Sequence, residues 1–136
     1  MGVEQARAFI KENPRAVLAT RRRDGSPQMS PVLAAVDDEG RLVISSRETA
    51  YKTKNLRRDP RAWLCFLNPG FFGEWIQVEG TAEIIPLPEA MESLVDYYRR
   101  LSGEHPDWEE YRAAMVEEKR LIIRINIDRA GPDRSG

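Results

Sequence analysis

Apolar residues recur every three or four positions in three stretches of this chain, a spacing that places them on one face of a helix. These stretches lie at 3–10, 91–101 and 108–115, and Pro14 closes the first of them. A fourth, shorter helix is predicted at 49–59, where basic side chains dominate. The pattern thus predicts four helices, two of them adjacent in the second half of the chain.

Six further stretches are rich in apolar and β-branched residues and are bounded by turn residues, as strands are. They lie at 16–20, 28–36, 41–46, 61–67, 74–85 and 121–127. Short polar turns join the first three, which should therefore be antiparallel. Gly80, inside the fifth strand, predicts a bulge or a close backbone approach. Because strand–helix–strand alternation is missing, the pattern favours a mainly β (α+β) fold, a small closed or split barrel with flanking helices.

The chain of 136 residues is predicted to form one domain over residues 1–128, followed by a flexible polar tail at 129–136. Its 21 basic and 22 acidic side chains give a net charge of −1, too balanced for binding nucleic acid or an anionic membrane. No stretch approaches the roughly 20 apolar residues of a membrane span, and residues 1–13 do not resemble a signal peptide. We therefore expect a soluble, cytoplasmic protein with no nucleic-acid or membrane partner.

The inventory of reactive side chains is short. His105 is the single histidine and Cys65 the single cysteine, so neither a metal site nor an internal disulfide is predicted. We expect His105 to satisfy backbone groups between the last two helices. The phosphate-binding loop, the Rossmann glycine motif and the Gly-x-Ser-x-Gly elbow are absent, and no pair of carboxylates marks an acid–base couple. No catalytic residue is predicted, and any chemistry should come from a bound cofactor.

The segment at 45–60 carries the most specific pattern. Ser45 and Ser46 end an apolar strand, and the following turn and helix add Arg47, Lys52 and Lys54. Hydroxyls, a helix N-terminus and cations together make a favourable place for a phosphate group. The same pattern also fits a solvated basic helix, and the segment by itself leaves both interpretations open.

Several motifs, in order along the chain, resemble those of one family. They are Val17-Leu18-Ala19-Thr20 with the segment 24–32, Lys52-Thr53-Lys54-Asn55-Leu56 with the segment 57–61, Val78-Glu79-Gly80-Thr81-Ala82, Tyr97-Tyr98-Arg99 and the segment 103–108. The chain resembles the split β-barrel flavin and deazaflavin oxidoreductases, a group that includes the pyridoxamine-phosphate-oxidase-like (PPOX class) proteins. The last two motifs are similar to the branch that uses the deazaflavin coenzyme F420 (FDOR-B type). The resemblance implies a six-stranded antiparallel split β-barrel of the FMN-binding type.

The resemblance also implies where a cofactor binds. Lys52 would be the principal contact of the cofactor's phosphate. The other expected cofactor-binding residues are Ser45, Ser46, Arg47, Tyr51, Thr53, Lys54, Asn55 and Trp75, with Met29, Ser30, Pro31 and Val32 along the ring. Members of the family often carry a second basic residue two positions before the motif lysine, where this chain has Ala50. Arg47 and Lys54 are the candidates to replace it.

The implied function is an F420-dependent reductase that transfers hydride to an unsaturated or conjugated small-molecule acceptor. An FMN-binding oxidoreductase of the same fold and a non-enzymatic carrier of F420 or haem are the alternatives. Because family members are homodimers with cofactor sites between subunits, the expected partner is a second copy of the chain. Phe71, Phe72 and Trp75 are candidates to reach the other subunit's site, although both phenylalanine rings could instead cover their own core.

Overall fold

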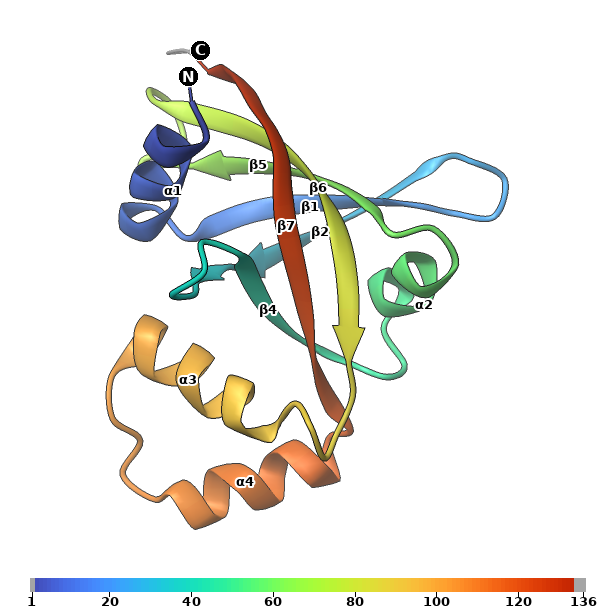
Figure 1. Cartoon of the computed structure of the whole chain (residues 1–136), viewed down its shortest axis with the longest axis vertical. Coiled ribbons are helices and arrows are strands. Elements are labelled where there is room, and N and C mark those ends of the chain that lie inside the picture. Colours follow the sequence, from blue (N-terminus) through green and yellow to red (C-terminus); the bar gives the residue numbers. More distant parts are fainter. Residues whose placement is uncertain (1, 134–136) are drawn as a thin grey trace.

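The computed structural model describes residues 2–133, and within them seven strands form one antiparallel sheet in the order β2-β1-β5-β6-β7-β4-β3 (Figure 1). The strands are β1 (Arg15–Arg21), β2 (Pro27–Leu33), β3 (Ala35–Val36), β4 (Leu42–Arg47), β5 (Arg61–Leu67), β6 (Trp75–Ile85) and β7 (Arg120–Asp133). The sheet curls into a half-barrel, so the mainly β, antiparallel prediction is confirmed.

The predicted count of six strands is wrong by one, because the stretch at 28–36 is divided at Ala34. Its first part, β2, pairs with β1 at one edge of the sheet, and its second part, β3, pairs with β4 at the other. The Ala34 N–H donates to the Pro14 carbonyl oxygen at 2.9 Å instead of to a sheet neighbour. The chain therefore crosses at Ala34 from one edge to the other, and β2 and β4 face each other across the split.

Two apolar clusters hold the fold together. The first fills the inside of the curled sheet, where Leu18, Leu64 and Phe66 are almost fully buried. The second lies between the outer face of β4 and β7 and two helices, and it includes Leu94 and Ile122. Since β7 is covered on both faces over this part, its sequence is a continuous apolar run rather than an alternating one.

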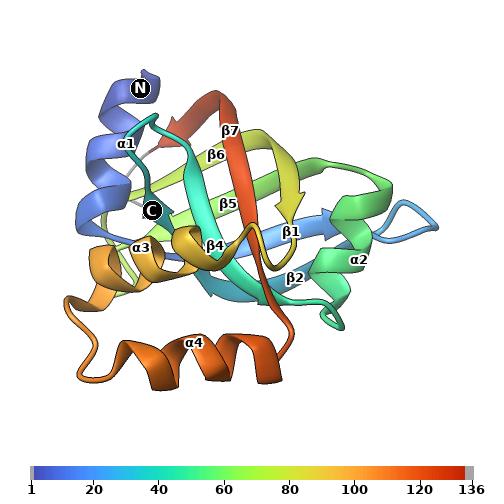
Figure 2. The same cartoon turned by 60° about the horizontal axis from the view of Figure 1, so that its bottom comes forward.

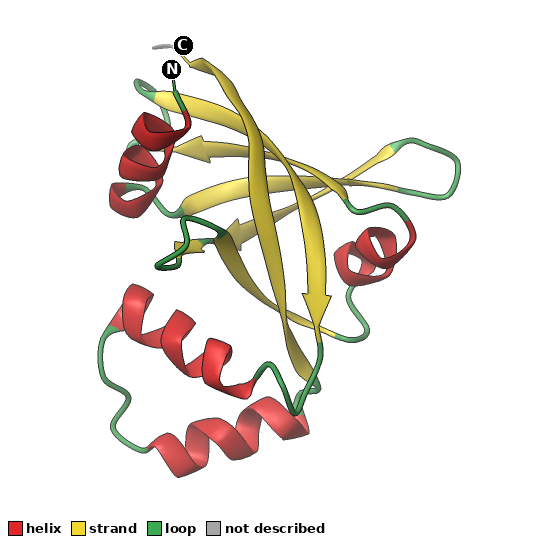
Figure 3. Cartoon of the chain, viewed as in Figure 1, coloured by secondary structure: helices red, strands yellow, loops and turns green. Residues whose placement is uncertain are grey.

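Four helices flank the sheet in the described residues (Figures 1 and 3). They are α1 (Val3–Glu12), α2 (Tyr51–Arg58), α3 (Met91–Ser102) and α4 (Trp108–Glu117). Helix α1 packs against β3 and β7, and α2 packs against β1, β2 and β6. Figure 2 shows α3 and α4 as a pair that covers the side of the sheet carrying β4. None of these helices is long and apolar enough to cross a bilayer.

The prediction for Gly80 is confirmed. The register between β6 and β7 shifts between Glu79 and Gly80, as at a bulge. A Cβ atom at Gly80 would lie 2.3 Å from the carbonyl oxygen of Asn126 and 2.5 Å from Cγ2 of Ile125. The two long strands therefore approach each other at this point more closely than any side chain would allow.

The C-terminal segment differs from the sequence-based expectation. Strand β7 continues to Asp133, and Ile76 of β6 pairs with that residue. The first part of the predicted tail at 129–136 is thus strand, since β6 is long enough to offer it a hydrogen-bonding partner. Residues 134–136 lie outside the described residues.

The junction before α4 has the structural role expected of His105. The side chain of Asp107 accepts a hydrogen bond from the Glu110 N–H at 3.1 Å, which caps the helix. Nδ1 of His105 accepts from the Asp107 N–H at 2.9 Å, so the imidazole satisfies the backbone of the capping residue. The ring also packs against Tyr98, Trp108 and Tyr111.

Candidate functional site

Buried hydroxyl groups attach α2 to the end of β4. Thr53 Oγ1 donates to the Arg47 carbonyl oxygen at 2.8 Å, and the Ser46 hydroxyl lies 2.9 Å from the same Oγ1. Because Thr53 uses its proton on the carbonyl, Ser46 is the donor between the two hydroxyls. Both side chains are buried. Ser46 and Thr53, predicted as cofactor neighbours, thus hold the first turn of α2 against the strand.

The far end of α2 is attached to β1 by Asn55. Its Nδ2 donates to Thr20 Oγ1 at 3.0 Å, and both residues are buried. Arg58 donates to Asn55 Oδ1 at 3.2 Å and also to the Arg21 carbonyl oxygen. The two attachments fix α2 at both ends, which gives Lys52 a defined position relative to β4.

Lys52 is a partly buried cation that has no counter-ion in the part of the chain that the structure describes. Among the described residues its Nζ makes no hydrogen bond and no ion pair. Burial lowers the pKa of Lys52 below its usual value, and the nearby positive charge of Arg120 lowers that pKa further. Both effects disfavour the ammonium form, and an anion bound beside Nζ would relieve both. This geometry favours the phosphate-site interpretation over the solvated basic helix.

Arg120, whose charge acts on Lys52, has a second arginine opposite it on the neighbouring strand. Arg47 ends β4 and Arg120 begins β7, and the two are directly opposite each other in the register. Glu118 Oε1 accepts from Arg120 Nε at 2.9 Å and from Arg47 Nη2 at 3.4 Å. We call Arg47, Lys52 and Arg120 the cationic cluster. The sequence pointed to Arg47 and Lys52, whereas Arg120 was missed because it lies far along the chain.

Tyr97 of α3 links the two sides of the split next to this cluster. Its hydroxyl donates to the Leu33 carbonyl oxygen of β2 at 2.9 Å. Burial raises the pKa of Tyr97, against smaller opposite effects of the Ser45 backbone and the charge of Arg120. Tyr97 therefore stands between β2 and Ser45 of β4. The sequence placed it in a family motif but gave it no role in the site.

The segment predicted to run along the cofactor ring forms the free edge of the sheet. β2 pairs only with β1, so the backbone groups on its other side have no sheet neighbour. Met29 and Pro31 face outward and are exposed, while Val32 packs towards the core. Ser30 Oγ is buried and has no hydrogen-bond partner within residues 2–133. The edge thus offers an apolar surface, while the carbonyl oxygens of Met29 and Leu33 already accept hydrogen bonds from Gln28 and Tyr97.

A second group of cations lines a cavity on the other side of α2. The cavity has a volume of about 790 Å³ and lies between α2 and the β1–β2 turn, which projects beside the helix (Figure 2). We call it the basic groove; its lining residues are Arg22, Arg23, Asp24, Tyr51, Lys54, Asn55, Arg57 and Arg58. Arg57 is paired with Glu48, at 2.6 and 3.1 Å. From the sequence alone, the arginines of this turn fit a solvated loop.

α2 therefore divides the predicted residues between two places. Lys52 and Arg47 belong to the cationic cluster, whereas Tyr51, Lys54 and Asn55 line the basic groove. Tyr51 is 75% exposed, and its ring is open to solvent at the mouth of the groove. The structure thus separates residues that the sequence had placed around one phosphate.

Trp75 is not brought to the cationic cluster by this chain. It begins β6 next to Ile76, which pairs with Asp133 at the end of β7, while Arg120 begins β7. At a rise of about 3.3 Å per residue, β7 separates the two places by roughly 40 Å along its length. Phe71 and Phe72 lie in the loop before Trp75 and are 62% and 82% exposed. The alternative in which these two rings cover their own core is therefore excluded.

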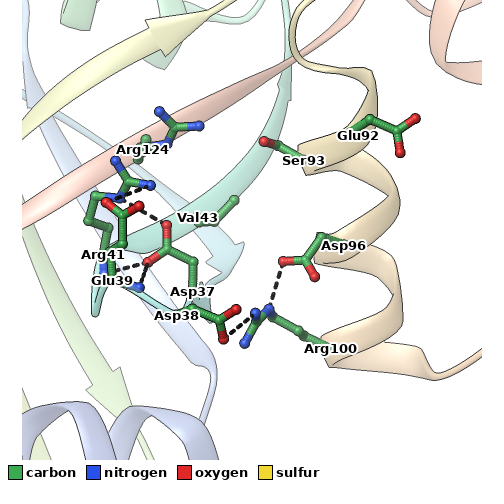
Figure 4. A pocket seen from close by; sticks show the side chains of 10 residues that line it. All are labelled: Asp37, Asp38, Glu39, Arg41, Val43, Glu92, Ser93, Asp96, Arg100 and Arg124. Carbon is green, nitrogen blue, oxygen red and sulfur yellow. Dashed lines mark hydrogen bonds and ion pairs between the residues drawn. The ribbon is translucent and has the colours of Figure 1, made fainter.

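A third pocket is polar, and acidic side chains outnumber basic ones in its lining (Figure 4). It lies between the β3–β4 turn, β7 and α3, and its lining includes Arg41, Arg100 and several acidic side chains. Arg41 pairs with Asp37 at 2.9 Å, and Arg100 pairs with Asp38 at 2.9 Å and Asp96 at 2.7 Å. Because five carboxylates and three arginines line it, the pocket attracts an anionic ligand much less than the cationic cluster does.

Comparisons with known structures support the fold. A conserved hypothetical protein of Mycobacterium tuberculosis is 27% identical, with a TM-score of 0.79 over 99% of this chain and 85% of the other. An F420 reductase is 24% identical, with a TM-score of 0.69 over 90% of this chain and 94% of the other. An FAD-binding protein of Mesorhizobium loti is 21% identical, with a TM-score of 0.72 over 100% and 95%.

A family model covers almost the whole chain. The model describes pyridoxamine 5'-phosphate oxidase and matches residues 3–131, which include every strand but the last residues of β7. The matched region contains the cationic cluster, the free edge of β2 and the basic groove. The curled antiparallel sheet and this match agree, and the chain belongs to the pyridoxamine 5'-phosphate oxidase family.

Proposed function

We propose that this protein is an F420-dependent oxidoreductase that reduces an unsaturated or conjugated small molecule. The observation that carries the proposal is the partly buried ammonium group of Lys52, which has no counter-ion among the described residues and stands at the end of β4. Lysine acts there as a point charge suited to a phosphate group. Membership of a family named for a phosphate-bearing substrate supports this use of the site.

The residues present fit such a cofactor in three places. Lys52 and Arg47 would hold its phosphate, and the edge strand β2 would hold its ring. The basic groove would hold an acidic extension, because Arg22, Arg23 and Lys54 gather there. Coenzyme F420 carries such an extension, whereas FMN ends at its phosphate and would leave the groove unused. This difference favours F420 over FMN.

The chain's own residues would act by binding and orientation. When bound, the reduced deazaflavin supplies the hydride. Lys52 would fix one end of the cofactor, and the backbone of β2 would fix the plane of the ring, so that an acceptor stacked on the ring reacts within one complex. We assign no proton donor in the chain, and the acceptor's proton is expected to come from solvent.

We expect the site to be completed by a second copy of the chain. Phe71 and Phe72 are large exposed rings at the end of the sheet opposite to the cationic cluster. Exposed aromatic groups of this size favour burial in an interface, at about 25 cal/mol for each Å² of apolar surface. Sedimentation velocity should give twice the mass of the chain. Phe72→Ser should shift the protein towards monomer, whereas Val116→Ser, at an exposed apolar residue of α4, should not.

The experiment that tests the function is a titration of the purified protein with F420 and, separately, with FMN, followed by tryptophan fluorescence. Micromolar or tighter binding of F420 with weak binding of FMN is expected. Reduced F420 should then be oxidised in the presence of a conjugated acceptor. Preference for FMN would instead identify a flavin enzyme of the same fold. Tight binding of F420 or haem without turnover of any acceptor would identify a carrier.

A further inference from the structure

The cationic cluster contains an unfavourable pair of like charges. Arg47 and Arg120 are directly opposite on neighbouring antiparallel strands, where side chains share one face of the sheet. Like charges at such positions destabilise a sheet. Burial is the main cause that lowers the pKa of the nearby Lys52, and the positive charge of Arg120 lowers that pKa further. The fold therefore brings Arg120 close to two other cations, Arg47 opposite it on β4 and Lys52 on α2.

We infer that Arg120 is the second cation of the phosphate site, in place of the basic residue that is absent at Ala50, and that Glu118 occupies the site as an internal counter-ion until a phosphate displaces it. The identification of the ligand as the phosphate of a cofactor rests on the proposed function. The assignment of Arg120 and Glu118 rests on the contacts of the two residues.

Backbone contacts hold Arg120 beside α2. The Glu48 N–H, at the start of the turn that leads to α2, donates to the Lys119 carbonyl oxygen at 3.0 Å. Thr53 fixes the first turn of α2 to the Arg47 carbonyl. The connection from β4 to α2 and the connection from α4 to β7 are thus joined directly. Arg120 approaches Lys52 from the connection between α4 and β7.

The turn after α4 lies at Lys119. Its φ is +55°, the left-handed conformation that commonly ends a helix. This conformation places Glu118 and Arg120 on either side of a tight turn.

Glu118 is suited to act as a displaceable counter-ion. One of its oxygens, Oε1, accepts from both arginines, at 2.9 Å from Arg120 and 3.4 Å from Arg47. Its hydrogen bond with Arg120 is the main reason that the pKa of Glu118 is lowered. One carboxylate against three cations leaves the cluster positively charged overall. The Glu118 side chain is 35% exposed, so it has room to rotate into solvent. A phosphate presents more acceptor oxygens to the same donors.

Opposite substitutions test the inference. Binding of inorganic phosphate and of F420 would be measured by calorimetry and fluorescence for the wild type, Arg120→Gln and Glu118→Gln. We expect Arg120→Gln to weaken the binding of both ligands about tenfold or more. Glu118→Gln should tighten both several-fold, because it removes the competing charge and keeps the shape. A misfolded variant would not gain affinity, so tighter binding in Glu118→Gln cannot result from a folding defect.

Two controls separate a local effect from a change in total charge. Arg124→Gln removes a positive charge from the same face of β7, four positions beyond Arg120 and beside Glu83. It should change both affinities by less than about twofold. Arg120→Lys should recover part of the affinity lost in Arg120→Gln, since it restores the charge without the planar donor group.

The outcomes also separate this inference from the proposed function. If the wild type binds F420 while neither Arg120→Gln nor Glu118→Gln alters its affinity, the inference is wrong and the function stands. If phosphate binding follows the expected order but neither F420 nor FMN binds, the anion site stands and the oxidoreductase proposal fails. Weaker binding in Glu118→Gln would overturn the counter-ion role, and a wild type that binds neither phosphate nor cofactor would overturn both proposals.

Discussion

Replacement of Lys52 by alanine is expected to weaken cofactor binding by about 1.5–3 kcal/mol, or roughly 10- to 150-fold, the range for one charge-assisted hydrogen bond. The partly buried ammonium has no counter-ion among the described residues, so its full charge is available to a phosphate. The dissociation constants of F420 for the wild type and for Lys52→Ala, measured by tryptophan fluorescence, check this result. An unchanged constant would remove Lys52 from the site.

A change to methionine distinguishes a binding role from a structural one. Lys52→Met keeps a long apolar side chain and removes the charge that burial and Arg120 make unfavourable in the free protein. A lowered lysine pKa in the folded state destabilises that state at neutral pH, where lysine is charged in the unfolded chain. Lys52→Met should therefore bind F420 as poorly as Lys52→Ala and melt no lower than the wild type. Lys11→Met, at an exposed position on α1, is the control for both measurements.

Replacement of Gly80 by alanine is expected to give the largest loss of stability, about 3 kcal/mol. The new Cβ would overlap the Asn126 carbonyl oxygen at 2.3 Å, and a backbone atom within a strand cannot move aside as a side chain can. The contact between β6 and β7 would have to open over several residues. Denaturant unfolding of both proteins, with the midpoint and the slope compared, gives the free-energy difference.

Gly103→Ala is the matched comparison. Gly103 ends α3 with a φ of +81°, but a Cβ there would meet no atom within 4 Å. Its replacement should cost only the strain of a backbone region that essentially only glycine adopts, about 1–3 kcal/mol, with no steric overlap. A loss below about 1 kcal/mol in Gly80→Ala would mean that the strands relieve the steric overlap at Gly80, which would contradict a fixed close approach at this position.

The positions of most elements were predictable from the sequence, because they follow from local patterns. The amphipathic period of α3, the turn residues around each strand and the helix that carries Lys52 each act over a few residues. Gly80 was recognisable for the same reason, since a glycine weakens a long apolar strand unless a bulge or a close backbone contact requires it. The family motifs are also local, and they indicated the segment in which we propose the phosphate site.

The number of strands was not predictable in this way. The division at Ala34 depends on a hydrogen bond to Pro14, twenty positions earlier, and nothing in the apolar pattern of the strand records it. The extension of β7 to Asp133 likewise depends on the length of β6. In both cases the hydrogen-bonding partner, and not the propensity of the segment itself, decides where the strand ends.

The sequence by itself determined that a short basic helix follows the strand ending at Arg47, and the family resemblance predicted that this helix binds a phosphate. The tertiary structure decided which side chains surround this helix. It added Arg120 and Tyr97, placed Tyr51 and Lys54 in a separate groove, and left Trp75 at the other end of the sheet. The physical reason is that charges and hydrogen bonds act through space. A local pattern fixes which residues share a helix or strand, while only the register of the strands and the docking of α2 and α3 fix which of them meet.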